Sequence, residues 1–270
     1  MKLGLTLPSF VADPAVPLGV ASAAEHAGLD GVFVYDHLFR RGRDGARRPA
    51  LESTGLLGAV AGSTSRVSVG VLVARAWTRP VATLACSLET AQRISGGRVV
   101  AAIGAGDAES REENETFGLG FGTIEERVRR LRAAVVTARD RGFPVWVGGQ
   151  APSVRAVAAE EADGWNAWGT PVETFGREVE ELRRAAKRDP FTCSWGGLVV
   201  VGVDDDAARE KAARLGARED VLVGGPQRVA DALRRYRDAG AGWVVVAPID
   251  SSDAANATLL GEEVRSRVCA

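Results

Sequence analysis

Short apolar runs recur along the chain, and amphipathic stretches of helical length separate them. The clearest unit has apolar runs at Val67–Val73 and Val99–Ile103, which flank a segment whose apolar residues recur at helical spacing. Apolar runs without alternation are typical of strands that are buried on both faces. The pair Gly96-Gly97 supplies the left-handed residue that ends the intervening helix. Two strands joined by such a helix run parallel, so this segment predicts a β-α-β unit.

The same alternation extends over the whole chain. It predicts strands at Lys2–Leu7, Gly31–Tyr35, Val67–Val73, Val99–Ile103, Pro144–Gly148, Gly164–Trp168, Leu198–Val203 and Gly242–Ala247. The helices between them are expected at about Pro17–Ala27, Leu51–Gly62 and Val81–Ile94, from a capping box at Thr123–Glu126 to about Arg139, from Pro152, from Thr170-Pro171 to about Lys187, after Asp204, from Pro226 and over Asp253–Val268.

Eight strand and helix units without a linker-like change of composition predict a single (β/α)8 TIM barrel domain that spans residues 1–270. An open, doubly wound parallel sheet is the alternative. Arg40–Arg48 and Asp107–Gly122 are expected to be loops, and the first of them to be mobile.

Composition narrows the function classes. A net charge of −1 gives no indication of a nucleic-acid or membrane partner. The arginines between Arg40 and Arg48 are interpreted as solvated surface, with contacts to an anionic cofactor tail as the alternative. Three widely spaced cysteines without a Cys-x-x-Cys pair argue against a disulfide framework or a zinc site. The start lacks a signal-peptide pattern and no apolar run reaches membrane-spanning length, so we expect a cytoplasmic protein.

Ligands of parallel α/β barrels bind where the carboxyl ends of the strands share one rim. In this chain the rim positions are Pro8-Ser9, Asp36-His37, Ala74-Arg75, Gly106-Asp107, Gly149-Gln150, Gly169-Thr170, Gly202 and Pro248–Asp250. These positions are poor in metal ligands, because the chain has only two histidines, His26 and His37. Neither a nucleophile elbow nor a Walker loop occurs. We therefore expect no metal site, and chemistry that belongs to a bound organic cofactor.

Two glycine-containing turns are candidates for contact with that cofactor. The turn Gly148–Ser153 precedes a helix that begins at Pro152, so its glycines and free amides suit a phosphate. A tight strand-to-helix turn that needs glycine for geometry alone explains the same residues equally well. Gly104-Ala105-Gly106 favours a flat ring or a substrate, because the acidic stretch from Asp107 onward would repel an anion.

Asp36 and His37 follow the second predicted strand. His37 is a candidate proton donor or acceptor near neutral pH. Asp107, at the end of the fourth strand, is the nearest candidate for a carboxylate partner, although a cap on the acidic stretch is the slightly preferred role for it.

These segments together resemble the luciferase-like monooxygenase superfamily, whose members are (β/α)8 barrels that bind FMN or the deazaflavin coenzyme F420. The resemblance covers nearly the whole chain. The segments that carry it are Glu25–Leu38, Arg79-Pro80, Ile94–Arg98, Gly104–Gly106, Glu126-Arg127, Gly148-Gly149, Ala162–Trp165, Gly225-Pro226 and Ala239-Gly240. The chain departs from the family at Arg75–Thr78, which follows no pattern that aligns residue by residue, and at Gly225, where many relatives carry Thr or Ser.

The resemblance implies where a cofactor sits. Its ring would lie over the ends of the third and fourth strands and its phosphate near the Gly149–Ser153 turn, with a cis non-proline bond near Val73-Ala74. His37 and Asp107 would handle protons. The implied cofactor-binding residues are Asp36, Val73, Ala74, Gly104, Ala105, Gly106, Gly148, Gly149, Gln150, Ala151, Ser153, Trp168, Gly169 and Thr170.

The leading functional hypothesis is therefore an F420-dependent oxidoreductase that moves a hydride between the coenzyme and a small organic substrate. An FMN-dependent monooxygenase that works with a separate flavin reductase is the first alternative, and a flavin-binding barrel without catalysis is the second. A phosphosugar lyase or isomerase is disfavoured, because Lys2, Lys187 and Lys211 all lie away from the rim. Substrate identity is not readable from the sequence, and a homodimer stays open because relatives frequently dimerise.

Overall fold

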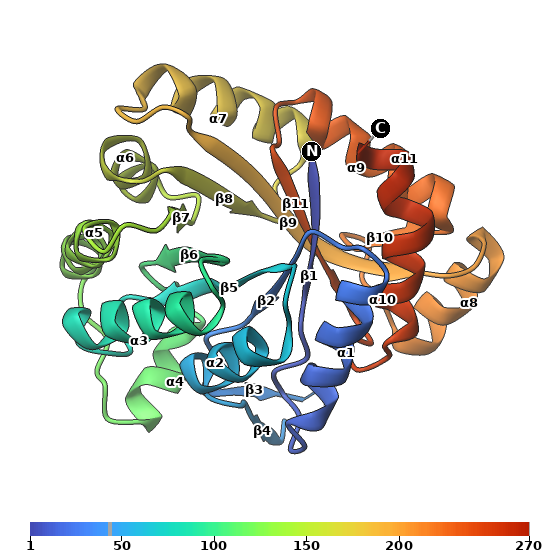
Figure 1. The fold of residues 1–270 in the computed structure, drawn as a ribbon, viewed down its shortest axis with the longest axis horizontal. Helices are drawn as coiled ribbons and strands as arrows, with labels where there is room; N and C mark the ends of the chain where they lie inside the picture. Colours follow the sequence, from blue (N-terminus) through green and yellow to red (C-terminus); the bar gives the residue numbers. More distant parts are fainter. Residues whose placement is uncertain (43–44, 270) are drawn as a thin grey trace.

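The computed structural model describes residues 1–42 and 45–269, and its main sheet closes into a parallel barrel (Figure 1). The barrel strands are β1 (Lys2–Thr6), β2 (Gly31–Val34), β5 (Ser68–Arg75), β6 (Val99–Gly104), β7 (Val145–Gly148), β8 (Gly164–Trp168), β9 (Thr192–Val201) and β11 (Trp243–Pro248). They pair in the order β11-β1-β2-β5-β6-β7-β8-β9, and β9 pairs in turn with β11. The predicted (β/α)8 barrel is confirmed.

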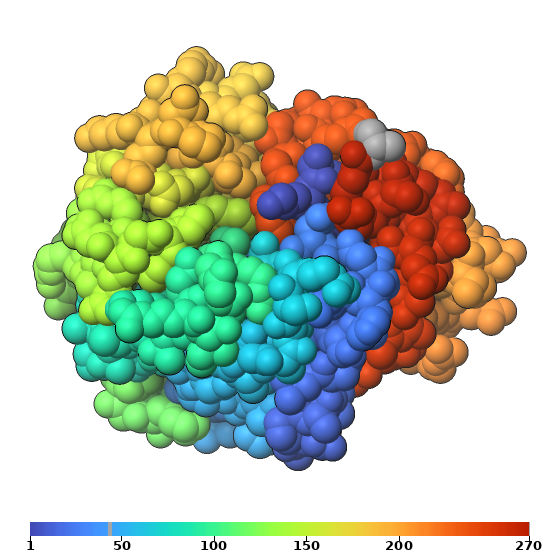
Figure 2. Space-filling model, in the orientation of Figure 1, coloured from blue at the N-terminus to red at the C-terminus, as the bar shows by residue number. Residues whose placement is uncertain are grey.

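An outer ring of helices covers the barrel. Its members are α1 (Ala15–His26), α2 (Ser53–Ser63), α3 (Val81–Ile94), α5 (Ile124–Arg139), α6 (Pro152–Glu161), α7 (Val172–Ala185), α8 (Asp205–Leu215), α9 (Pro226–Asp238), α10 (Ala255–Leu259), the π-helical segment η1 (Leu260–Val264) and α11 (Arg265–Cys269). The short helix α4 (Ser110–Thr116) lies between β6 and α5 in the chain and is not part of this ring. The first strand lies beside the C-terminal helices, as the adjoining blue and red surfaces of Figure 2 show. Within the described residues, no helix is both long and apolar enough to cross a membrane.

Aromatic rings fill the inside of the barrel. Phe33, Trp146 and Trp243 project inward from β2, β7 and β11, with ring centroids 5.8–6.4 Å apart. Glycines on the barrel strands leave room for them, because a Cβ on Gly31 would lie 2.9 Å from Trp243 and one on Gly70 would lie 2.9 Å from Phe33. Such contacts are too close for real atoms. The barrel is therefore a packed core, and a ligand has access only to its rim.

The seventh barrel strand begins earlier than predicted. β9 starts at Thr192, pairs with β8 as far as Gly196, and then extends past the barrel to pair with β10 (Leu222–Gly224), which the sequence did not predict. Polar residues and Gly196-Gly197 interrupt its apolar pattern. Those glycines are needed, because a Cβ on Gly196 would lie 2.5 Å from the Trp168 ring. As a result, Leu198 and not Gly202 lines the cavity at the rim.

Both expected loops contain regular structure. The arms of the Arg40–Arg48 segment form an antiparallel hairpin of β3 (Phe39–Arg41) and β4 (Arg47–Pro49), while residues 43 and 44 lie outside the described residues. Helix α4 occupies the acidic stretch. Glu112 of α4 forms ion pairs with Arg41 and Arg47, so the hairpin and the helix hold each other over the rim. Charged, exposed strands lack the apolar alternation that predicts a strand.

Candidate functional site

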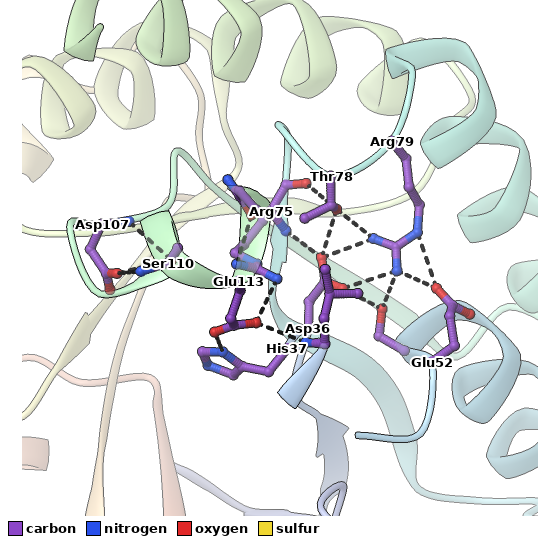
Figure 3. A network of polar contacts seen from close by, with 12 residues as sticks. Asp36, His37, Glu52, Arg75, Thr78, Arg79, Asp107, Ser110 and Glu113 are labelled. Atoms are coloured by element: carbon purple, nitrogen blue, oxygen red, sulfur yellow. Dashed lines mark hydrogen bonds and ion pairs between the residues drawn. The ribbon is translucent and has the colours of Figure 1, made fainter. Parts of the chain in front are cut away.

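Asp36 at the end of β2 is the centre of a buried polar network (Figure 3). Its side chain is 1% exposed and accepts hydrogen bonds from both Nη atoms of Arg79 at 2.9 and 3.0 Å, and from Ser53 Oγ and the Arg75 backbone N–H at 2.7 Å each. Burial by itself raises the pKa of the Asp36 carboxyl, but Arg79 and the Arg75 amide outweigh it and hold that pKa below its usual range. Asp36 thus fixes the end of β2 to the turn after β5 and to α2.

His37, the next residue, points away from this network and is held by Glu113 of α4. Its Nδ1 lies 2.6 Å from Glu113 Oε1, while Glu113 Oε2 accepts from the Leu38 backbone N–H at 2.8 Å and from Arg75 Nη2 at 3.1 Å. Glu113 and Arg75 are 6% and 4% exposed. The His37 side chain is 39% exposed. The Nδ1 edge of the His37 ring is therefore held by the buried Glu113, while part of the ring remains exposed.

Asp107 forms hydrogen bonds with Ser110, and the carboxylate beside His37 belongs to Glu113. Asp107 Oδ1 accepts from the Ser110 backbone N–H at 3.0 Å and from Ser110 Oγ at 2.9 Å, which makes it a cap on the start of α4. The pairing of Asp107 with His37 that the sequence suggested is wrong, and the capping role is correct. The reason is that the acidic stretch forms a helix, which places Glu113 rather than Asp107 beside His37. A proton-handling role of Asp107 has no support in this geometry.

A cavity of about 1290 Å³ opens beside His37, at the ends of β1, β2, β9 and β11. Phe10, Tyr35 and Phe39 line one side, and Leu198 and Ile249 lie among its apolar residues. The guanidinium of Arg40 lies over the Phe10 ring at 4.8 Å from its centroid. Of the catalytic and cofactor-binding residues expected from the sequence, His37 lines this cavity, together with the expected rim positions Pro8-Ser9 and Pro248–Asp250. The aromatic residues were missed because each lies in a separate stretch of chain and belongs to no recognisable motif.

The ends of β5 and β6 lie on another part of the rim. The peptide bond Leu72-Val73 is cis, one residue before the expected position. The half-buried Val73 side chain lies between two glycines, since a Cβ on Gly104 would come within 2.5 Å of Val73 Cγ2 and one on Gly148 would overlap Val73 Cγ1. These glycines therefore make room for Val73, where a ring had been expected. Ala74 and Ala105 belong to the core between barrel and helices, so they offer only backbone atoms to a ligand.

The turn between β7 and α6 is open. Gly149 has φ +133°, and the buried Trp165 donates its indole N–H to the Gly149 carbonyl at 2.8 Å. Gln150 Nε2 donates hydrogen bonds to the Trp168 carbonyl and to Thr170 Oγ1, at 2.6 Å each. These bonds connect the turn to the end of β8. Gly169 follows with φ +65°.

The donors of this turn fit a phosphate. In the described part of the chain, the backbone N–H groups of Gln150, Ala151 and Ser153 have no hydrogen-bond partner, and these residues are exposed. They precede or begin α6, where the helix dipole favours an anion. Gly106, with φ +73°, lies at the end of β6. Contact of any of these residues with a cofactor stays a prediction.

Relatives of known activity resemble the chain over most of its length. A 5,10-methylenetetrahydromethanopterin reductase of Methanolobus tindarius is 23% identical, covering 81% of this chain and 71% of the relative. An F420-dependent glucose-6-phosphate dehydrogenase of Nakamurella multipartita is 26% identical, covering 97% and 93%.

Solved structures share the fold. An F420-dependent secondary alcohol dehydrogenase superposes with a TM-score of 0.80 at 18% identity, covering 99% of this chain and 98% of the other. An EDTA monooxygenase of Chelativorans sp. BNC1 superposes with a TM-score of 0.82 at 14% identity, covering 100% and 93%. The family profile described as luciferase-like monooxygenase matches residues 1–220. With this match and the barrel described above, the chain belongs to the luciferase-like monooxygenase family.

Proposed function

We propose that the protein is an F420-dependent oxidoreductase that transfers a hydride between the deazaflavin coenzyme and a small organic substrate. The observation that carries this proposal is the placement of His37, whose ring is anchored on one side and faces a cavity of about 1290 Å³ on the other. The F420-dependent glucose-6-phosphate dehydrogenase of Nakamurella multipartita, which aligns with nearly the whole chain, supports the coenzyme. The enzyme belongs to the oxidoreductase class in which the relatives described above work.

Residues of the turn before α6 would hold the coenzyme. The free amides of Gln150, Ala151 and Ser153 provide donors for its phosphate, and Gln150 keeps the turn aligned with β8. Val73 presents an apolar side chain between the ends of β6 and β7, a surface that suits a flat ring. When bound, the deazaflavin supplies the site that accepts or donates a hydride.

His37 would move the proton that accompanies the hydride. His37 lines the cavity, and no hydrogen-bond partner for its Nε2 is found in the described residues. A substrate hydroxyl or carbonyl in the cavity would therefore meet Nε2 directly. The packed aromatic interior keeps water from reaching this point through the barrel.

Titration of the purified apoprotein with F420 and with FMN tests the proposal, with binding followed by fluorescence. We expect F420 to bind at micromolar concentration or below and FMN to bind more weakly. Replacing Ser153 with Pro removes a donor N–H at a helix position that tolerates proline, so it should weaken F420 binding while the fold persists. Micromolar binding of FMN alone contradicts the proposal.

An FMN-dependent monooxygenase is the second candidate. It is favoured by the description of the matching family profile and by the fold shared with the EDTA monooxygenase. Such an enzyme would need a separate flavin reductase as partner. Oxygen uptake with reduced FMN and a panel of small substrates distinguishes the two, because a deazaflavin reacts poorly with oxygen and the proposed enzyme should show no uptake with reduced F420.

A further inference from the structure

The carboxylate of Glu113 is shared between two kinds of partner. Its Oε2 accepts from two groups that are donors only, the Leu38 backbone N–H at 2.8 Å and Arg75 Nη2 at 3.1 Å. Its Oε1 lies 2.6 Å from His37 Nδ1, which is short for an N–H···O contact, as expected when the acceptor is charged. Both carboxylate oxygens therefore have hydrogen-bond partners. The Leu38 N–H and Arg75 can only donate, so they fix the orientation of the carboxylate.

The groups around the Glu113 carboxylate keep it ionised. Burial raises the pKa of the Glu113 carboxyl, but the hydrogen bonds from His37 and Leu38 and the charge of Arg75 hold it below its usual range. An ionised carboxylate accepts hydrogen bonds and donates none. The proton in the short contact must therefore sit on His37 Nδ1, because a neutral imidazole carries its one N–H on either nitrogen and Glu113 offers only an acceptor.

We propose that Glu113, anchored by Leu38 and Arg75, is a positioning residue that holds neutral His37 in the tautomer with its proton on Nδ1. Nε2 then presents a lone pair to the cavity and accepts a proton. The proposal rests on the proposed function only in naming a substrate group as the source of that proton. The tautomer itself is a property of the protein and does not depend on which cofactor binds.

In the variant Glu113→Gln we expect the opposite tautomer of His37. The Leu38 N–H and Arg75 Nη2 still require an acceptor, so the amide oxygen takes the place of Oε2. The amide NH₂ group then faces His37 Nδ1 and donates to it, which moves the proton of the neutral ring to Nε2. A change of one carboxylate oxygen to an NH₂ group thus reverses the direction of proton transfer at the cavity.

Two-bond ¹H–¹⁵N correlation spectra of the full chain, labelled at histidine, measure the tautomer directly. The chain holds only His26 and His37, so the spectrum contains two rings and the variant His37→Gln assigns them. His26, on α1 with Nδ1 2.7 Å from the Ser22 carbonyl, is the internal reference. Spectra are recorded at a pH where both rings are neutral.

Glu112→Gln is the matched control, because Glu112 lies on the same helix and pairs with Arg41 and Arg47.

In the wild type we expect the Nδ1–H form of His37 to exceed the Nε2–H form by about tenfold or more, given the strength of a charge-assisted hydrogen bond. Glu113→Gln should reverse the ratio, and Glu112→Gln should leave it unchanged. Equal tautomers or an Nε2–H majority in the wild type overturns the proposal without any variant. A folded Glu113→Gln variant that keeps the Nδ1–H form, or an equal effect of Glu112→Gln, also overturns it.

Measurements of kcat and of F420 binding test the proposed function separately from the role of Glu113. In the direction that takes a proton from the substrate, Glu113→Gln should lower kcat by about 10²-fold and leave the affinity for F420 unchanged. A wild type that neither binds F420 nor turns over contradicts the proposed function, while the tautomer ratio still decides the role of Glu113.

Discussion

Single residues at the rim divide into those that hold the scaffold and those that face the cavity. Asp36 and Arg79 are 1% and 14% exposed at their side chains, so their ion pair is sheltered from water. Removing the Asp36 carboxylate would leave Arg79 with Glu52, whose side chain is 51% exposed, as its acidic partner. His37 follows Asp36 in the chain but has an exposed ring. The Asp-His motif therefore combines a structural residue with the residue that we propose moves the proton.

Asp36→Asn should lower the free energy of unfolding by about 1–3 kcal/mol, because the sheltered Arg79 guanidinium is then left with the more exposed Glu52 as its acidic partner. Urea denaturation of the wild type and the variant measures the loss. Asp107→Asn is the control, since it removes a carboxylate from an exposed cap and should cost about 1 kcal/mol or less. Equal losses in the two variants would show that the Asp36 network does not support the rim.

His37→Ala should lower turnover by about 10²–10⁴-fold with little change in the affinity for F420, because it removes the proton-transfer group and not the cofactor cradle. Steady-state kinetics and a fluorescence titration measure the two effects separately. His26→Ala, on the exposed face of α1, should leave both unchanged. Full activity of His37→Ala would favour chemistry without this residue.

Between elements, Glu25 joins the end of α1 to the start of β5. It is 9% exposed, and its Oε1 accepts from the backbone N–H groups of Ser65, Arg66 and Val67 at 2.9, 2.6 and 3.1 Å. Burial opposes the charge, but these three amides lower the pKa of Glu25 from 4.5 to about 2. The ionised form therefore stabilises the fold above pH 4.5, and this contribution is lost as the pH falls from 4.5 toward 2.

Glu25→Gln should cost about 1–3 kcal/mol of unfolding free energy at pH 7, and the difference from the wild type should shrink as the pH approaches 2. Urea denaturation at several pH values measures the profile. Glu160→Gln, which removes an exposed ion pair with Arg132, should change stability by no more than about 0.5 kcal/mol. Parallel pH profiles of wild type and Glu25→Gln would contradict the role of the amide bonds.

The contact between Val73 and its flanking glycines gives a prediction about strands β5, β6 and β7. Gly148→Ala should destabilise the protein by about 1–3 kcal/mol because its methyl group overlaps Val73, and adding Val73→Ala should recover part of the loss. Thermal or urea denaturation of the single and double variants shows the coupling. Gly58→Ala, in α2 with nothing within 4 Å of a new Cβ, is the control and should be neutral or stabilising. Independent effects of the two changes would contradict this contact.

Elements with a strong apolar period could be predicted from the sequence, and those built from charges could not. The barrel strands, the capping box at Thr123 and the turn before Pro152 all follow from local patterns. The β3–β4 hairpin and α4 lack such a pattern, because ion pairs hold them together. Glu113 was missed for the same reason. It lies among several glutamates, and only the folded helix shows which one faces His37.

Some motifs that carry the family resemblance prove to be structural. Arg98, at the end of the Ile94–Arg98 motif, donates to the carbonyls of Ala61, Thr64 and Val67 and so closes the end of α2. Sequence pattern alone cannot separate such a residue from one that contacts a ligand, because both roles require a particular side chain at a particular spacing.

For the whole molecule, the aromatic interior confines chemistry to the rim, and the rim has two distinct parts. The turn before α6, near β7 and β8, offers free amides. The cavity beside His37 lies at the ends of β1, β2, β9 and β11. Val73 lies between the ends of β6 and β7. A cofactor that spans these parts would place its phosphate on the turn and its ring next to the substrate cavity.

A crystal structure of the protein with F420 tests this arrangement most directly. The account predicts the phosphate within hydrogen-bond distance of the amides of Gln150, Ala151 and Ser153, with the deazaflavin ring over Val73 and the cavity beside His37 left for the substrate. Electron density for the phosphate at another part of the molecule, or a ring that lies away from both Val73 and His37, would contradict it.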